Sequence, residues 1–102
     1  MFFNFEQHNG FGVLKLFGNF TSGNAAKLKK AFFVGLSNSE HLIMDFKGVA
    51  ETDDFFAEQI LSLMKISGKA KKKLTIINCH HIQDALKSGF DREHDFNRHV
   101  LL

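Results

Sequence analysis

Apolar and polar positions divide the chain into alternating strand-like and helix-like segments. Two short β-prone runs, Phe2–Gln7 and Phe11–Gly18, stand on either side of the dipeptide Asn9-Gly10. Because both residues of that dipeptide tolerate positive φ, they favour a tight turn, and the two runs predict an antiparallel hairpin.

Helical spacing follows in two longer segments. The first begins near residue 21, where Thr21 or Ser22 is expected to cap the helix by accepting its free N–H groups. Its apolar positions recur every three or four residues, at Ala25, Leu28, Ala31, Phe32 and Leu36. The second runs from about Asp54 to Ser67. Its predicted buried stripe consists of Phe56, Ile60, Leu63 and Met64. A third, short helix is predicted near residues 81–88.

Two continuous apolar runs, His41–Phe46 and Leu74–Asn78, lie between the helical segments and are typical of strands covered on both faces. Strands that alternate with helices predict parallel pairing through right-handed crossovers. The expected fold class is therefore α/β: a single domain over residues 1–102, with a mixed, mostly parallel sheet of four to five strands and helices packed against it. Residues 1–18 form the hairpin at the sheet edge in this prediction, and residues 91–102 form a short tail.

Composition limits the classes of function that the chain can have. The 102 residues, 44% hydrophobic and 24% charged, suit one globular core. A formal net charge of +2 is too small to indicate nucleic-acid binding, and no apolar run reaches the roughly 20 residues needed to span a bilayer. Because Cys79 is the single cysteine and the first residues lack signal-peptide features, we expect a cytoplasmic protein. The 13 Phe residues are expected to fill the core.

Three stretches in this order resemble the STAS family, the anti-sigma-factor antagonists of bacterial partner-switching regulators. They read "GVLKLFGNF", "HLIMDFKGVAETDD" and "KLTIINCHHIQDALKSGFD", and the resemblance covers about residues 11–96. The family shows a hydrophobic-Asp pair, a Gly-Val step and then Asp-Ser-Ser-Gly at a helix start. Here Met44-Asp45 matches the pair, Gly48-Val49 the step and Asp53 the helix-start aspartate. Later, Phe90 stands where the family has a Leu after Gly.

The chain departs from this pattern directly after Asp53. Asp54, Phe55 and Phe56 replace the family's Ser-Ser-Gly, and a carboxylate cannot accept a phosphate ester as a serine hydroxyl does. The resemblance therefore implies a phosphosite equivalent at Asp54 that phosphorylation does not switch. In one interpretation, Asp53 and Asp54 cap the helix and their charges complement its dipole. In the other, Asp54 imitates the phosphorylated form incompletely, because a carboxylate carries about −1 charge and a phosphate roughly −1.5 to −2.

Two neighbours of this acidic pair have open interpretations. Phe55 falls on the flank of the helix, away from its buried stripe, where it either anchors a partner or tucks beneath the preceding loop. Thr52 offers a hydroxyl that is either a displaced phosphosite or a local hydrogen-bonding group.

Other chemistry is less well supported by the sequence. Metal-ligand residue types surround Cys79-His80, with further members at His81, Asp91, His94 and His99, but their spacing matches no zinc pattern. The lysines of residues 65–73 are typical of a solvated turn. Carboxylates at adjacent positions do not form the facing pair of an acid–base enzyme, and no glycine-rich phosphate cradle is present.

The function that we expect is a non-catalytic regulatory module. By the resemblance, it binds a kinase-like anti-sigma factor or a related signalling protein, without cofactor, metal, nucleic acid or membrane insertion; a homodimer is left open. The expected partner-binding and switch region consists of Thr21, Ser22, Thr52, Asp53, Asp54, Phe55 and Glu58. Two alternatives remain: a STAS subunit of an intermembrane lipid-transport ATPase complex, and a metal- or nucleotide-binding protein centred on Cys79 and His80.

Overall fold

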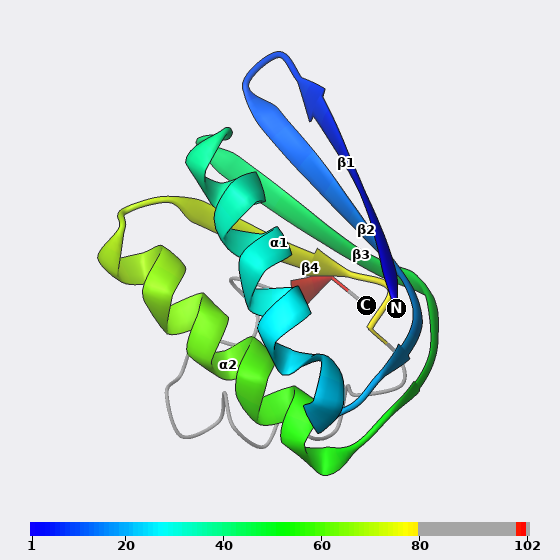
Figure 1. Ribbon diagram of the computed structural model, residues 1–102. Helices are drawn as coiled ribbons and strands as arrows, with labels where there is room; N and C mark the ends of the chain where they lie inside the picture. Colours follow the sequence, from blue (N-terminus) through cyan, green and yellow to red (C-terminus); the bar gives the residue numbers. More distant parts are fainter. Residues whose placement is uncertain (80–99, 102) are drawn as a thin grey trace.

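The computed structural model describes residues 1–79 and 100–101, which form one mixed sheet with two helices on it (Figure 1). The strands lie in the order β1-β2-β3-β4-β5. Their bounds are β1 Phe2–His8, β2 Phe11–Phe20, β3 His41–Thr52, β4 Lys73–Ile77 and β5 Val100–Leu101. The helices are α1 Ala25–Ser37 and α2 Asp54–Lys69, and a 3-10 turn, η1, spans Ser22–Asn24.

The strand pairing confirms the expected fold class. β1 and β2 form the antiparallel hairpin at the sheet edge, with Gly10 in the turn at φ +89°. The β2–β3, β3–β4 and β4–β5 pairs are all parallel. β5 lies in the segment expected to form a short tail, residues 91–102, where Val100 and Leu101 pair with Ile76 and Ile77. The helix predicted near residues 81–88 lies outside the described residues.

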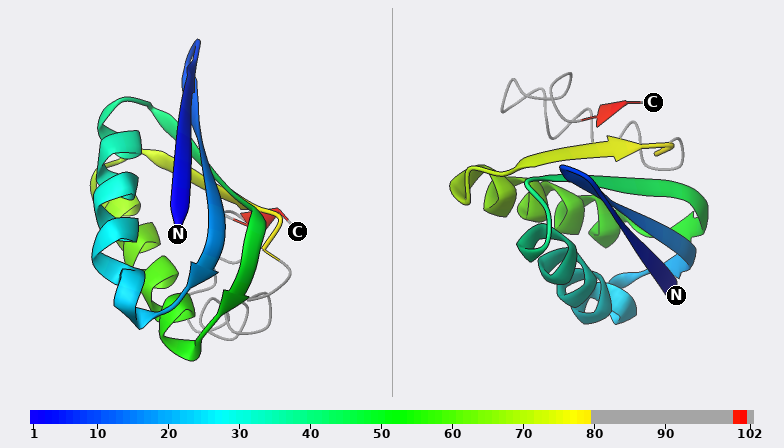
Figure 2. Two further views of the ribbon diagram at one scale, coloured as in Figure 1. Left: turned by 45° about the vertical axis from the view of Figure 1, so that its right-hand side comes forward. Right: turned by 90° about the horizontal axis from the view of Figure 1, so that it is seen from above.

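The two helices α1 and α2 pack on the same face of the sheet (Figure 2). Burial consequently alternates along β3: Leu42, Met44 and Phe46 are buried, whereas the residues between them are half-buried. In the part of the chain that the structure describes, the expected burial of residues 41–46 on both faces is complete on one face only. β3 also continues to Thr52, six residues beyond the predicted end, because β2 pairs with it all the way to Phe20.

The helices bury the stripes that helical spacing predicted. In α1 the buried residues include Leu28, Ala31, Phe32 and Leu36, and in α2 they include Phe56, Ile60, Leu63 and Met64. The expectation that Phe residues fill the core holds only in part. Four of them are buried in the described part of the chain, but Phe2, Phe3, Phe17, Phe33 and Phe55 are exposed. No helix in residues 1–79 is long and apolar enough to cross a membrane.

A half-buried histidine joins the amino ends of β3 and β4. His41 Nε2 lies 2.8 Å from Thr75 Oγ1, and His41 pairs with Lys73 in the strand register. Burial lowers the pKa of the His41 imidazole, and the positive charge of Lys73 lowers it further. The folded protein therefore favours the neutral imidazole.

This environment predicts that the free energy of unfolding falls as the pH is lowered from about 7.5 to about 5. In the unfolded chain His41 has the ordinary histidine pKa of about 6.5, so it binds a proton more readily than it does in the folded protein. As the pH falls from about 6.5 towards the lowered pKa of the folded protein, proton binding therefore favours the unfolded chain and the protein loses stability. Urea unfolding of the wild type and of His41→Gln at both pH values measures the effect. When the pH is lowered, the free energy of unfolding should fall more in the wild type than in His41→Gln. A pH-independent difference would contradict this prediction.

Candidate functional site

The carboxyl ends of β2 and β3 deliver two segments to one end of the sheet. Phe20, the last residue of β2, pairs with Thr52, the last residue of β3. β2 continues into the 3-10 turn η1, and β3 continues through Asp53 into α2. Two register shifts, between Lys15 and Phe17 and between Gly18 and Asn19, bring the strand ends into this alignment.

The Asp53 carboxylate fastens these two segments together. Its Oδ1 accepts a hydrogen bond from the Phe56 N–H at 3.0 Å, which makes Asp53 the N-cap of α2. Its Oδ2 accepts from the Ser22 N–H at 2.9 Å, across 31 residues of sequence. The capping role predicted for Asp53 is confirmed, and the second bond shows that Asp53 also fixes the position of η1 relative to α2.

The expectation that Thr21 or Ser22 caps the first helix is wrong. Thr21 precedes η1 and Asn24 precedes α1, and neither side chain makes a capping hydrogen bond. The Asn24 side chain instead donates to the Asn19 carbonyl at 3.0 Å. The loop is therefore held by a backbone N–H donated to Asp53 and not by its own hydroxyls.

Three aromatic rings lie beneath this junction. The Phe56 ring centroid is 5.1 Å from that of Phe20 and 5.6 Å from that of Phe46. All three residues are buried, and they come from α2, β2 and β3 respectively. This packing gives the loop and the helix start a rigid apolar support.

Polar residues and one exposed aromatic side chain accompany this junction among the described residues. Phe55 is 44% exposed, which confirms that it lies off the buried stripe, and Glu58 is exposed one turn further along α2. Thr21 and Ser22 are also exposed, whereas Thr52 is half-buried. The predicted switch region is thus brought together at one end of the molecule.

Residue 54 is the first residue of α2, as predicted. Its side chain lies outside the described part of the structure, so the interpretation of Asp54 as a phosphate imitation stays a prediction. A negative charge at a helix start is favoured by the free N–H groups and the positive end of the helix dipole.

The Met44-Asp45 pair also makes a contact that the sequence did not reveal. Asp45 Oδ1 accepts from Asn78 Nδ2 at 2.8 Å and from the Lys47 N–H at 2.9 Å. Asn78 has φ +58°, in the left-handed region that Asn tolerates, at the point where β4 ends. Asp45 therefore fixes the exit of β4; an Asn directly after an apolar run was the signal in the sequence.

Cys79 does not have the properties of a nucleophile. It is buried, and burial raises the pKa of its thiol, which keeps the sulfur protonated. His80, His81, Asp91, His94 and His99 lie outside the described residues. Within residues 1–79 and 100–101, no three His, Cys, Asp or Glu side chains are grouped so that they could hold a metal ion.

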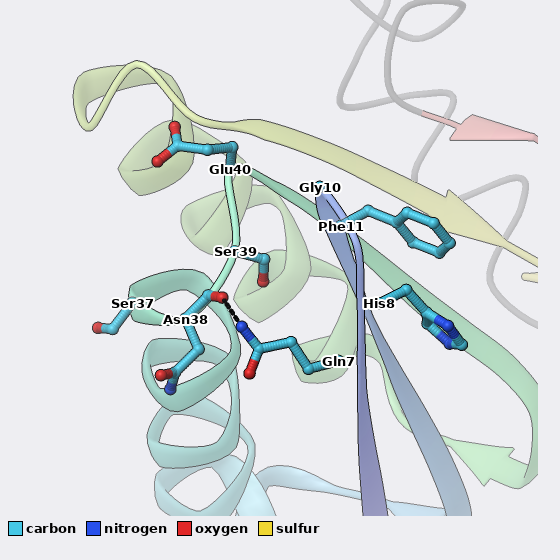
Figure 3. Close-up of a pocket in the computed structure, with 8 residues that line it drawn as sticks. All are labelled: Gln7, His8, Gly10, Phe11, Ser37, Asn38, Ser39 and Glu40. Carbon is cyan, nitrogen blue, oxygen red and sulfur yellow. Dashed lines mark hydrogen bonds between the residues drawn. The ribbon is translucent and has the colours of Figure 1, made fainter.

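A polar hollow of about 230 Å³ lies at the opposite end of the sheet, beside the hairpin turn (Figure 3). Gln7 Nε2 donates to the Asn38 carbonyl at 2.9 Å and so fastens the hairpin to the loop between α1 and β3. Figure 3 shows His8 and Phe11 side by side and directed away from Asn38, and their rings stack at 4.8 Å. These contacts account for the hollow structurally, and we assign no binding role to it.

Comparison with known proteins gives a family and a fold. The model for the STAS domain family matches residues 2–99. The structure resembles the anti-sigma factor antagonist SpoIIAA in its unphosphorylated form, with 16% identity, a TM-score of 0.61, and coverage of 98% of this chain and 87% of that one. The phosphorylated form of SpoIIAA, described as a Bacillus cell fate determinant, gives 16% identity and a TM-score of 0.63, with 97% of this chain and 88% of that chain covered.

A larger protein contains the same fold. SLC26A9 matches with 16% identity and a TM-score of 0.76 over 90% of this chain, but the match spans only 18% of the SLC26A9 chain. At this level of identity the three structures show the fold alone. No curated protein sequence matches the chain.

Proposed function

This chain belongs to the STAS domain family, and on that premise we propose that it is a non-catalytic regulatory module that docks onto a protein partner. The docking surface consists of Thr21, Ser22, Thr52, Asp53, Asp54, Phe55 and Glu58. The observation that carries the proposal is the double hydrogen bond of Asp53 to Ser22 and Phe56. It makes one rigid surface from a loop and a helix that lie 31 residues apart in sequence, which lowers the entropic cost of binding.

Phe55 is the anchor of this surface. A large aromatic side chain that is 44% exposed, with a carboxylate at Glu58 on the same helix, fits the pattern of an interface hot spot with a polar surround. The partner class that we propose is a kinase-like anti-sigma factor or a related signalling protein in the cytoplasm. The fold shared with SpoIIAA, named an anti-sigma factor antagonist, supports this choice.

We further propose that phosphorylation at position 54 does not switch the partner interaction. SpoIIAA has been solved with and without phosphate, whereas this chain has no hydroxyl at position 54 or 55. A carboxylate borne on the first residue of α2 supplies a constant negative charge where the helix dipole favours it. The buried, protonated thiol of Cys79 supports a role without covalent catalysis.

Asp54→Ser tests this proposal. With the cognate kinase and ATP, we expect mass spectrometry to find a phosphate at position 54 of the variant and none on residues 52–55 of the wild type. Because the variant exchanges a permanent charge for a removable one, its affinity for the partner should change by about fivefold or more before phosphorylation, which corresponds to roughly 1 kcal/mol.

Asp54→Asn is the matched control, since it removes the charge without adding a hydroxyl. It should change the affinity for the partner in the same direction as unphosphorylated Asp54→Ser does. Phosphate on Thr52 of the wild type would overturn the proposal of an unswitched surface. Unchanged affinity in both variants would reduce Asp54 to a structural residue of the helix start.

A second candidate is a STAS subunit of an intermembrane lipid-transport ATPase complex. Its support is that the same fold occupies 18% of the SLC26A9 chain, so the fold also serves as one part of a much larger protein. Identification of a captured partner as a transport ATPase subunit would select this candidate over the anti-sigma factor. The same docking surface serves both.

A further inference from the structure

An apolar groove of about 420 Å³ lies between the edge strand β1 and helix α1. Its apolar lining is formed by Met1, Phe3, Phe5, Leu14, Ala31 and Val34, and two lysines, Lys27 and Lys30, complete it. Residues of the edge strand β1 and of α1 line the groove together. A volume of this size is within the range of about 300–1,000 Å³ that is usual for small-molecule sites.

Phe5 is one of the aromatic residues that line the groove. A Cβ atom placed on Gly12 would lie 2.7 Å from Cε1 of Phe5, and one placed on Gly35 would lie 3.5 Å from the same atom. The Phe5 ring therefore lies close to Gly12, where a larger residue would clash with it, and within ordinary contact range of Gly35 in α1. Towards solvent, Phe3 is 38% and Val34 49% exposed, so apolar surface remains uncovered.

The groove is polar at one end and apolar at the other. Four α1 residues line it, Lys27, Lys30, Ala31 and Val34, and their spacing places them on one face of the helix. The lysines belong to the amino-terminal half of α1, and Val34 lies beside Gly35, which approaches Phe5. A ligand that follows the helix would meet positive charge first and hydrocarbon afterwards.

The two lysines have no compensating charge in the described part of the chain. α1 contains three lysines and no acidic residue. The ion pairs among residues 1–79 join Glu6 to Lys15 and to His8, and they involve neither Lys27 nor Lys30. The face therefore combines an uncovered apolar surface with unneutralised positive charge.

We propose that this groove binds a free long-chain carboxylate, a single-chain anionic amphiphile. The tail lies against Phe3, Phe5 and Val34, and the carboxylate lies between the ammonium groups of Lys27 and Lys30. Burial of the tail provides the affinity and charge pairing fixes the direction. The site is independent of the proposed docking surface, because it shares no residue with it.

A membrane-surface patch is the competing explanation, and matched residues separate the two. Phe2 is more exposed than Phe3 but points to the opposite face of β1, since neighbouring residues of a strand alternate. Lys29 lies on α1 with its Nζ 6.0 Å from the Phe33 ring centroid, outside the groove lining. A membrane surface along α1 would use Lys29 as readily as Lys27 and Lys30, whereas the groove would not.

The test is a calorimetric titration with dodecanoate at about pH 8, below its micellar range, where the carboxylate is ionised and lysines are charged. We expect saturable binding at one site per chain. The double variant Lys27→Gln with Lys30→Gln should bind dodecanoate about tenfold more weakly, and so should Phe3→Ser. Dodecanol, which has no carboxylate, should bind to the wild type more weakly than dodecanoate. Lys29→Gln and Phe2→Ser are the matched controls and should leave the affinity unchanged. All five positions are exposed, and thermal unfolding verifies that each variant is folded.

Absence of saturable dodecanoate binding by the folded wild type would overturn the proposal. Equal losses in Lys29→Gln and in the Lys27/Lys30 double variant would also overturn it, since a general positive surface would then explain the binding. A parallel measurement uses vesicles of phosphatidylglycerol. Association with vesicles that is reduced by Phe3→Ser, without binding of free dodecanoate, would assign the face to a membrane instead.

Discussion

Replacing Phe56 by alanine should lower the free energy of unfolding by about 3–5 kcal/mol. The Phe56 side chain is 2% exposed and packs against the rings of Phe20 and Phe46 at 5.1 and 5.6 Å. These two rings come from strands held in place by the sheet, so they cannot close the cavity that the substitution leaves. Urea unfolding followed by circular dichroism measures the loss.

Phe55→Ala is the matched control for this prediction, because it removes the same side chain from the adjacent residue. Phe55 is 44% exposed, and its loss should change stability by no more than about 0.5 kcal/mol. A similar loss in both variants would show that Phe55 is packed into the core, and it would remove the basis for an aromatic anchor on the surface.

Gly48→Ala should destabilise the protein by about 1–3 kcal/mol through overpacking. A Cβ atom at this position in β3 would lie 2.3 Å from Cδ1 of Phe17 and 2.9 Å from the Leu16 carbonyl oxygen. The second contact is with backbone, so rotation of the Phe17 ring alone does not relieve it. The register shift between Lys15 and Phe17 places these atoms over Gly48.

Gly68→Ala in α2 serves as the control for the effect of glycine itself. A Cβ there meets nothing within 4 Å, and alanine in a helix is favoured over glycine by roughly 0.5–1 kcal/mol. This variant should therefore be more stable than the wild type. If Gly48→Ala proved as stable as the wild type by thermal unfolding, the close approach of β2 and β3 at Phe17 would be contradicted.

Local signals in the sequence were sufficient for most of the fold. The hairpin around Gly10, the buried stripes of α1 and α2, and the start of α2 at Asp54 all follow from patterns within a few residues. Helical spacing and capping chemistry are short-range properties, which is why they could be read directly.

The features that the sequence did not predict depend on contacts between distant residues. Asp53 reaches Ser22 across 31 residues, and Asp45 reaches Asn78 across 33. The extension of β3 to Thr52 depends on pairing with β2, and β5 exists because Val100 pairs with Ile76. No local pattern contains such information.

Phe residues illustrate the same limit. Their abundance indicated a Phe-rich core, but composition cannot separate Phe5, which lines a groove, from Phe55, which faces solvent. Helical periodicity placed Phe55 off the buried stripe of α2. On β1, by contrast, the face of each aromatic residue became clear only from the register with β2.

The most direct test of the docking surface is the affinity of the purified protein partner for Phe55→Ser. It is compared with the affinity of the partner for the wild type and for Phe33→Ser. Phe33 is 40% exposed on α1 and lies outside the docking surface, so it controls for the general loss of an exposed aromatic residue. The account predicts that calorimetry finds about tenfold or greater weakening for Phe55→Ser and an unchanged affinity for Phe33→Ser. Equal affinity of wild type and Phe55→Ser for the partner would contradict it.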